Sequence, residues 1–363
     1  MYLLYKYIIY IHFFSILCGL SGFYNGQLWS DTDIDSKLSN VGYIPTFSFE
    51  KNIIDNKYLD FEFSRKFIYD SNDKVFLNDN YRSWIRYSDN NMDARLGLQK
   101  ISFGNAIILR PLNWFDSIDF RNTSGQTDGL NALRLQFYPN LTQSVWLWCV
   151  DQGDISCGGR FEFFNTYGSF AITYHYDMNN ELHEIFQIPQ IIDEQQLFEE
   201  IENSEELLQS IYEKIFYRRK NKRIGLEYRY DGNVGMWFDG SIISFNNSDY
   251  NSYNIITVGI DYTIPIYNGL LLMTETMKTS NVYPDIPELD LHSDMISTAL
   301  MVSTPVGLLN NLMYVSIKSW KSKDKFNFIR WSTTFDYLSL SCMLSVNPKP
   351  LEDSFKIMLI YNH

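Results

Sequence analysis

The chain has 363 residues, a formal net charge of −13 and 17% aromatic residues, including 26 Tyr and 26 Phe. Such an acidic balance argues against a general nucleic-acid or anionic-lipid binder, because those proteins neutralise phosphates with clustered Lys and Arg. After residue 25 no stretch approaches the roughly 18 apolar residues of a membrane-spanning helix, which excludes a helical membrane domain there.

The composition fits a transmembrane β-barrel. The mean hydropathy is only −0.22 although apolar residues make up 45% of the chain. A barrel strand shows one apolar face to lipid and one polar face to the lumen, so its mean hydropathy stays low. The fold class predicted from the sequence is therefore all-β, a transmembrane antiparallel β-barrel in a single domain.

The first 22 residues have the layout of a secretory signal: Lys6, an apolar run and small residues at the end. We expect this signal peptide to be cleaved on export. The alternatives are an N-terminal membrane anchor and lipidation at Cys18, and the second is disfavoured because Leu17 is not small. Residues 23–56 are interpreted as an N-terminal periplasmic segment ahead of a barrel at 57–363.

Alternation with a period of two recurs from about residue 57 to the end and predicts about sixteen strands, within 14–18. In "LSLSCMLSV" at 338–346, Leu, Cys and Val alternate with Ser and Met. Strands at 234–245, 269–278 and 311–320 have apolar residues on both faces, which indicates either a subunit interface or a packed interior. The predicted strands are 58–69, 80–88, 94–102, 131–138, 143–150, 160–167, 170–177, 223–231, 234–245, 253–263, 269–278, 295–303, 311–320, 326–336, 337–346 and 354–363.

The lengths of the predicted connections alternate. Short turns such as "DGNV", "YGS" and "PNLT" alternate with longer segments, of which 103–130 and 178–222 are the longest. Single-chain barrels of outer membranes sort their connections in this way, with short turns on the periplasmic side. This alternation of short and long connections is not expected in a soluble β-sandwich.

The 178–222 connection contains the one convincing helix, an insert at 190–222. Leu197, Ile201 and Leu208 recur at helical spacing, acidic residues gather at its start and basic residues at its end, as the helix dipole favours. The insert is interpreted as a solvated helix on the barrel mouth, with a partner-docking or lumen-plugging element as the alternative.

If the apolar strand faces point to lipid, the opposite faces line the lumen. An arginine-rich lumen favours anions and binds carboxylate or phosphate. The alternative is that these arginines pair with lumen acids such as Asp60 and Glu62 and merely hold the wall together. The predicted pore-lining residues are Arg82, Arg86, Arg95, Gln99, Arg134, Arg160, Glu227, Arg229, Lys318 and Arg330.

Four stretches between residues 95 and 150, "RLGLQKISFG", "ILRPLNWFD", "TDGLNALRLQFYPN" and "VWLWCV", together resemble porin-like outer-membrane β-barrel proteins of Gram-negative bacteria. Phe103 stands where many of those proteins have Trp, and the chain ends in His363 rather than an aromatic residue. The resemblance implies that the 103–130 loop folds inward and narrows the pore. Its implied constriction residues are Arg110, Asp116, Asp119 and Arg121. The alternative is an outer loop that caps the rim of the barrel, with Trp114 and Phe115 packed as a plug of core.

Cys149 and Cys157 lie symmetrically about Gly153, so a hairpin centred there would place them opposite each other. Export makes a disulfide feasible, and two independent thiols are the alternative.

No catalytic motif is present, and neither catalytic residues, a metal site nor a cofactor is predicted. His175 on a polar strand face is a poor basis for a hydrolase. The acidic group in "DIPELDLHSD" at 285–294 reads as a solvated loop, with a calcium site as the alternative.

The sequence therefore predicts a porin-like channel of the outer membrane of a Gram-negative bacterium for passive diffusion of small hydrophilic, preferentially anionic solutes. The expected partners are outer-membrane lipid, these solutes, the barrel-assembly machinery and further copies of the chain, without nucleic acid. Two alternatives stand beside it: a non-conducting barrel that acts as a surface receptor, adhesin or assembly scaffold, and a secreted soluble β protein. Unpaired lumen arginines would favour the channel.

Overall fold

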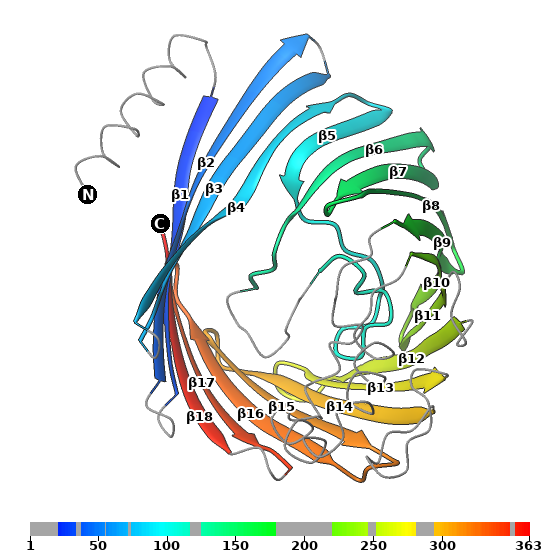
Figure 1. Ribbon diagram of the computed structural model, residues 1–363. Coiled ribbons are helices and arrows are strands. Elements are labelled where there is room, and N and C mark those ends of the chain that lie inside the picture. The colour runs from blue at the N-terminus through cyan, green and yellow to red at the C-terminus, as the bar shows by residue number, and fades with distance from the viewer. Residues whose placement is uncertain are drawn as a thin grey trace, which may run out of the picture.

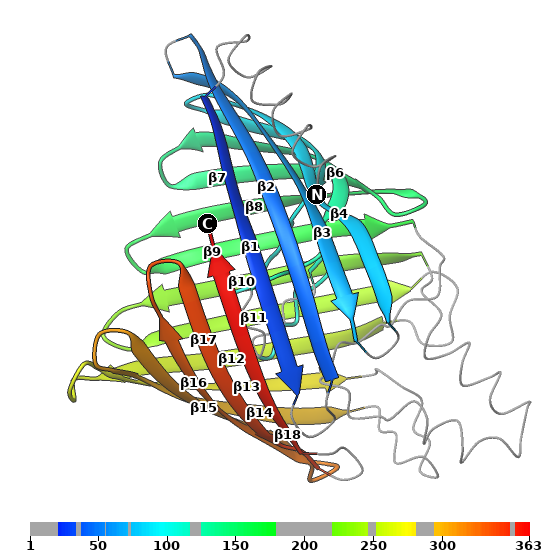
Figure 2. The ribbon, with the colours of Figure 1, turned by 90° about the vertical axis from the view of Figure 1, so that its left-hand side faces the viewer.

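A computed structural model describes residues 21–33, 38–54, 56–71, 74–116, 125–178, 220–245, 252–280, 294–348 and 353–363. The described residues form one sheet of 18 antiparallel strands, which the pairing of β1 with β18 closes into a barrel. Figure 1 shows the ring of strands, and Figure 2 shows β1 beside β18 at the seam. Within this part of the chain, no helix is long and apolar enough to cross a membrane.

The strands follow one another around the barrel in chain order. They are β1 (Ser21–Asp33), β2 (Leu38–Ile54), β3 (Lys57–Asp70), β4 (Val75–Ser88), β5 (Met92–Gln99), β6 (Leu130–Asn140), β7 (Gln143–Asp151), β8 (Ile155–Asn165), β9 (Gly168–Asp177), β10 (Asn221–Asp231), β11 (Gly235–Phe245), β12 (Ser252–Ile264), β13 (Leu270–Ser280), β14 (Met295–Val306), β15 (Asn310–Ser319), β16 (Lys325–Thr334), β17 (Leu338–Val346) and β18 (Ser354–Asn362).

The predicted barrel is confirmed, and two strands precede those expected from the sequence. Within residues 23–56, predicted to be a periplasmic segment, residues 23–33 and 38–54 instead belong to β1 and β2. β1 contains weak strand formers such as Gly26, yet it is paired along both edges, with β18 and with β2. Tertiary pairing thus overrides local propensity. Residues 1–20, most of the predicted signal peptide, lie outside the described residues.

The connections are sorted by length, as the sequence predicts. At one end of the barrel, neighbouring strands are joined by short turns, for example Leu141–Thr142 between β6 and β7, and Thr166–Tyr167 between β8 and β9. The other end carries the long connections 100–129, 178–220 and 281–294. We call these the short-turn end and the long-loop end.

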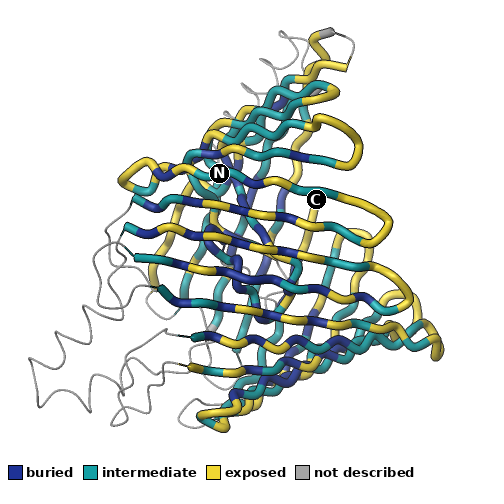
Figure 3. Tube along the Cα trace, turned by 90° about the vertical axis from the view of Figure 1, so that its right-hand side faces the viewer, coloured by how far each residue is buried: buried dark blue, intermediate teal, exposed yellow. Residues whose placement is uncertain are grey.

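Alternate residues of each strand point to opposite sides of the wall, and Figure 3 shows buried and exposed positions alternating along the strands. The outward side chains are exposed and largely apolar, with Leu96, Leu147, Val258 and Ile329 between 47% and 56% exposed. At the short-turn end the exposed outward residues are largely aromatic. These include Phe164, Tyr167, Tyr228, Tyr262, Tyr267, Phe335, Tyr337 and Tyr361. An apolar band bounded by aromatic residues is typical of barrels that span a bilayer.

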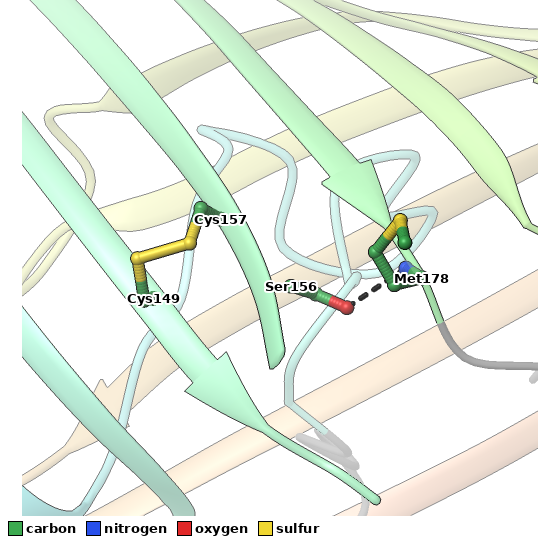
Figure 4. The surroundings of a disulfide bond; sticks show 4 residues. All are labelled: Cys149, Ser156, Cys157 and Met178. Atoms are coloured by element: carbon green, nitrogen blue, oxygen red, sulfur yellow. Dashed lines mark hydrogen bonds between the residues drawn. A yellow bond between two sulfur atoms is a disulfide. The ribbon is translucent and has the colours of Figure 1, made fainter. Parts of the chain in front are cut away.

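The predicted disulfide is confirmed. Cys149 on β7 and Cys157 on β8 are direct cross-strand partners with a Cα–Cα distance of 4.1 Å, and their sulfur atoms are bonded (Figure 4). The bond closes the hairpin at the long-loop end. Cys342, on the outward face of β17, is free.

We expect the Cys149→Ser/Cys157→Ser variant to be less stable by about 2–3 kcal/mol, the loop-closure entropy for a sequence separation of eight residues. Denaturant unfolding in detergent micelles, under oxidising and reducing conditions, measures the loss. The reductant should shift the wild-type midpoint and leave that of the variant unchanged. A wild-type protein indifferent to reductant would contradict the prediction.

Candidate functional site

The chain leaves the wall after β5 and enters the barrel. Residues 100–116 run inside the ring of strands as a buried coil (Figures 1 and 3). Phe103, Trp114 and Phe115 pack there against Trp148 and Val150 of β7. The loop therefore folds inward, as the resemblance implied, and its aromatic residues form buried core, as the alternative proposed.

Three buried carboxylates on the facing wall hold the loop by its backbone. Glu275 of β13 accepts hydrogen bonds from the backbone N–H groups of residues 107, 108 and 109 at 2.7, 3.0 and 2.7 Å. Asp239 of β11 accepts from the N–H groups of residues 105 and 106 at 2.6 and 2.7 Å, and from the Asn105 side chain. Glu227 of β10 accepts from the Gly104 N–H at 3.1 Å. The backbone N–H groups of six consecutive residues, 104–109, thus donate to carboxylates of the wall, and these bonds fix the position of the loop.

Side-chain contacts complete this docking. Thr257 of β12 donates to the Leu109 carbonyl at 2.8 Å, and the Trp114 indole donates to the Ser241 hydroxyl at 3.1 Å. Ala106 and Leu109 pack into an apolar cluster on the inward face of β11–β17. Three strands predicted to be apolar on both faces contribute to this cluster through Trp237, Met273 and Val315. Their inward apolar residues therefore form a packed interior under the loop.

The loop residues Arg110 and Asp116 bind each other. The guanidinium donates to both carboxylate oxygens, at 2.5 and 2.9 Å, and also to the Phe103 carbonyl. The Asp116 side chain is fully buried. The pair therefore holds the loop's own turn together. The other two predicted constriction residues, Asp119 and Arg121, lie outside the described residues.

Three arginines form a row on the opposite part of the wall. Arg86 on β4, Arg95 on β5 and Arg134 on β6 are direct cross-strand partners, so their side chains share the inward face. Arg86 is balanced by Asp60, 2.5 Å away, and Asp93, 3.5 Å away. We call these three residues the arginine row.

Within the part of the chain that the structure describes, Arg95 and Arg134 have no carboxylate within 4 Å. Each lies instead over an indole ring, Arg95 over Trp84 at 4.2 Å and Arg134 over Trp146 at 5.2 Å. A cation–π contact orients a guanidinium without cancelling its charge. The row therefore keeps positive charge on the inward face, although Asp60, Asp93 and Glu62 lie near enough to interact with it electrostatically.

A second arginine group is neutralised. Arg160 of β8 forms a bidentate ion pair with Glu227 and also contacts Glu162 at 2.7 Å and the Thr173 hydroxyl at 2.9 Å. Both Arg160 and Glu227 are buried. Glu227 also accepts a hydrogen bond from the Gly104 N–H, so the Arg160–Glu227 ion pair connects the wall to the loop.

The remaining predicted pore-lining residues fall into different environments. Arg82 and Gln99 are inward but buried, and they donate to the carbonyls of Thr127 and Ala132 respectively. Arg229 and Arg330 are inward and partly exposed. Lys318 is not on the lumen face.

The assignment of Lys318 to the lumen is wrong. On β15 the buried residues Val315 and Ile317 face the interior cluster, so Lys318 shares the outward face with Leu312. Both faces of this strand carry apolar residues, and alternation alone therefore could not orient it.

Sequence reasoning missed Asp239, Glu275, Trp84 and Trp146. The two acids had a signal, since each is an isolated carboxylate in a largely apolar strand, "GMWFDGSIISF" and "LLLMTETMKTS". A buried charge must be paired or hydrogen-bonded, and here the donors come from the loop. The predicted helix insert lies largely outside the described residues, as do residues 285–293 of the acidic loop. The described residues contain no group of three or more His, Cys, Asp or Glu that could hold a metal ion.

The fold has counterparts among solved structures. The chain matches Pseudomonas aeruginosa OccK11 (OpdR) with a TM-score of 0.58 and 8% identity, covering 95% of this chain and 96% of that one. It matches Salmonella typhi OmpF, solved with daunomycin, with a TM-score of 0.52 and 10% identity over 95% and 97% of the two chains. It matches a variant of a Rh. blastica porin with a TM-score of 0.50 and 8% identity over 95% and 100%.

No family model and no curated protein matches the sequence. The structural similarity at this low identity shows the fold: a closed antiparallel barrel of the kind found in porins of Gram-negative outer membranes.

Proposed function

We propose that this protein is a porin-like channel in the outer membrane of a Gram-negative bacterium and that small hydrophilic solutes, preferentially anions, diffuse through it. The observation that carries this proposal is the arginine row, whose Arg95 and Arg134 have no carboxylate within 4 Å among the described residues. Fixed positive charge on a lumen wall raises the local concentration of anions.

The docked loop supports the same proposal. It places buried structure inside the barrel opposite the row, and its own charged pair, Arg110 and Asp116, is internally neutralised. Selectivity would then come from the row and not from the loop charges. The receptor alternative has no comparable support in the described residues.

The proposal includes a route to the membrane. Export would use a cleaved signal peptide at 1–22, and insertion would use the barrel-assembly machinery. At the end of the chain, His363 lies among the aromatic rings of Tyr24, Tyr43 and Tyr361, with centroid distances of 5.3–6.0 Å. Its ring thus occupies an aromatic position on the outward face.

Planar-bilayer recording of the refolded protein under a salt gradient tests this function. We expect stable conductance steps with an anion-selective reversal potential, and Arg95→Gln/Arg134→Gln should move that potential toward zero. One charge at about 4 Å is worth about 1 kcal/mol in water, or roughly fivefold in the local concentration of an anion.

The matched control is Lys57→Gln/Lys222→Gln, which removes two charges from outward, exposed positions. Its reversal potential should stay at the wild-type value. A membrane-inserted protein without conductance steps would refute the channel, and an unchanged potential in the arginine variant would refute the role of the row.

A further inference from the structure

Lysines gather on the outer surface at the long-loop end of β13–β16. Lys278 lies near the end of β13, two lysines lie in the β15–β16 turn, and two lie on the strands at either side of it. Four of the five are exposed and Lys318 is half-buried. We call this group, Lys278, Lys318, Lys321, Lys323 and Lys325, the lysine rim.

Two of these lysines face each other directly. Lys318 and Lys325 are cross-strand partners on the outward face of β15 and β16. Like charges in this position repel, which destabilises a strand pair unless an anion lies between them. Among the described residues no lysine of the rim has a carboxylate within 4 Å, and Asp294 offers Lys321 only its backbone carbonyl. The pair therefore lacks a counterion from the described part of the chain.

The pair is also held in place. The Lys318 ammonium lies 4.1 Å from the centroid of the Trp320 ring, and the Trp320 indole donates to the Thr298 hydroxyl at 2.9 Å. Trp320 is 56% exposed. Tryptophan in this setting is typical of the boundary between lipid and water. The charge is thus fixed at the height where lipid headgroups lie.

The surface below the rim is apolar. Leu300 of β14, Ile329 of β16 and Leu344 of the neighbouring β17 are all exposed on the outward face. A cationic strip above an apolar strip complements an amphiphile whose anionic head lies above its acyl chains.

We propose that the lysine rim binds the phosphate groups of a phosphorylated membrane lipid in the leaflet at the long-loop end, with Lys318 and Lys325 as the central contacts. The inference rests on the proposed placement in an outer membrane and not on conduction. The lipid phosphate supplies the counterion that the Lys318–Lys325 pair lacks, and the acyl chains cover the apolar strip.

The test is a binding titration of the refolded, full-length protein in detergent with diphosphoryl lipid A and with its dephosphorylated form. We expect the wild type to prefer the phosphorylated form. Lys318→Gln/Lys325→Gln should bind it about thirtyfold more weakly, because each lysine at an anionic surface contributes a factor of about five. Lys318→Arg/Lys325→Arg should retain binding, and Lys57→Gln/Lys222→Gln serves as the matched control.

Equal affinity of the wild type and the glutamine variant would overturn the inference. Displacement of the lipid by millimolar inorganic phosphate would also overturn it, because the site would then select free anions. Bilayer recordings on the same preparations keep the two proposals apart. If the protein binds the lipid through these lysines but gives no conductance steps, the lipid site stands and the channel proposal fails. If the protein conducts but the glutamine variant binds the lipid as the wild type does, the channel proposal stands and the lipid site fails.

Discussion

Replacing Glu227 with alanine should lower the free energy of unfolding by about 3 kcal/mol, the lower part of the range for breaking a buried ion pair. The substitution leaves the buried Arg160 guanidinium without its bidentate partner and the Gly104 N–H without its acceptor. Glu162 and Thr173 remain as contacts of Arg160, and for that reason the larger values of the range are not expected.

Denaturant unfolding in micelles measures this loss. The control is Arg160→Met/Glu227→Leu, which removes both charges and fills the space with apolar side chains. Its stability should lie between those of the wild type and of Glu227→Ala, because apolar replacements of buried pairs are often neutral or stabilising but the Gly104 N–H still loses its acceptor. If the single and double variants were equally unstable, the cause would be lost packing and not an orphaned charge.

Replacing Glu275 with alanine should release the inward loop. The carboxylate accepts three backbone hydrogen bonds from the loop, and bonds to charged groups contribute roughly 1.5–3 kcal/mol each. Without it, three N–H groups of the loop, of which that of Leu109 is buried, lose their acceptor. We expect a larger and noisier single-channel conductance, together with new proteolytic cleavage within 104–109.

Two further variants keep this prediction specific. Glu275→Gln retains one acceptor oxygen and should give an intermediate effect. Asp261→Asn removes an inward charge on β12 that lies 3.9 Å from Arg229, and its conductance should keep the wild-type noise level. A Glu275→Ala protein that folds and conducts as the wild type does would show that apolar packing alone fixes the loop.

Together these contacts assign separate tasks to the charged residues inside the barrel. Glu227, Asp239 and Glu275 accept hydrogen bonds from the loop backbone. Arg95 and Arg134 instead lie over aromatic rings, which do not cancel their charge. The chain is acidic overall, yet part of its interior wall is basic, since these three acids bind the loop backbone and, in the case of Glu227, also Arg160.

The sequence by itself determined the features that depend on neighbouring residues. Alternation with a period of two predicted the strands, the class of barrel and, for Arg86, Arg95 and Arg134, the inward face. Residues symmetric about a turn predicted the Cys149–Cys157 bond. These features are local, because the pleat fixes the side of each residue from its neighbours.

Only the tertiary structure decided the rest, because the decisive contacts join distant residues. Strand β1 is held by pairing with β18 at the opposite end of the chain. Glu275 binds an N–H group 168 residues away, so its role could not be read from its own strand. Strand β15 has apolar residues on both faces, and packing of the loop against one of them turned Lys318 outward. The local pattern determines that side chains alternate between the two faces of a strand. Closure of the barrel and packing in its lumen determine which face points inward and which residues it contacts.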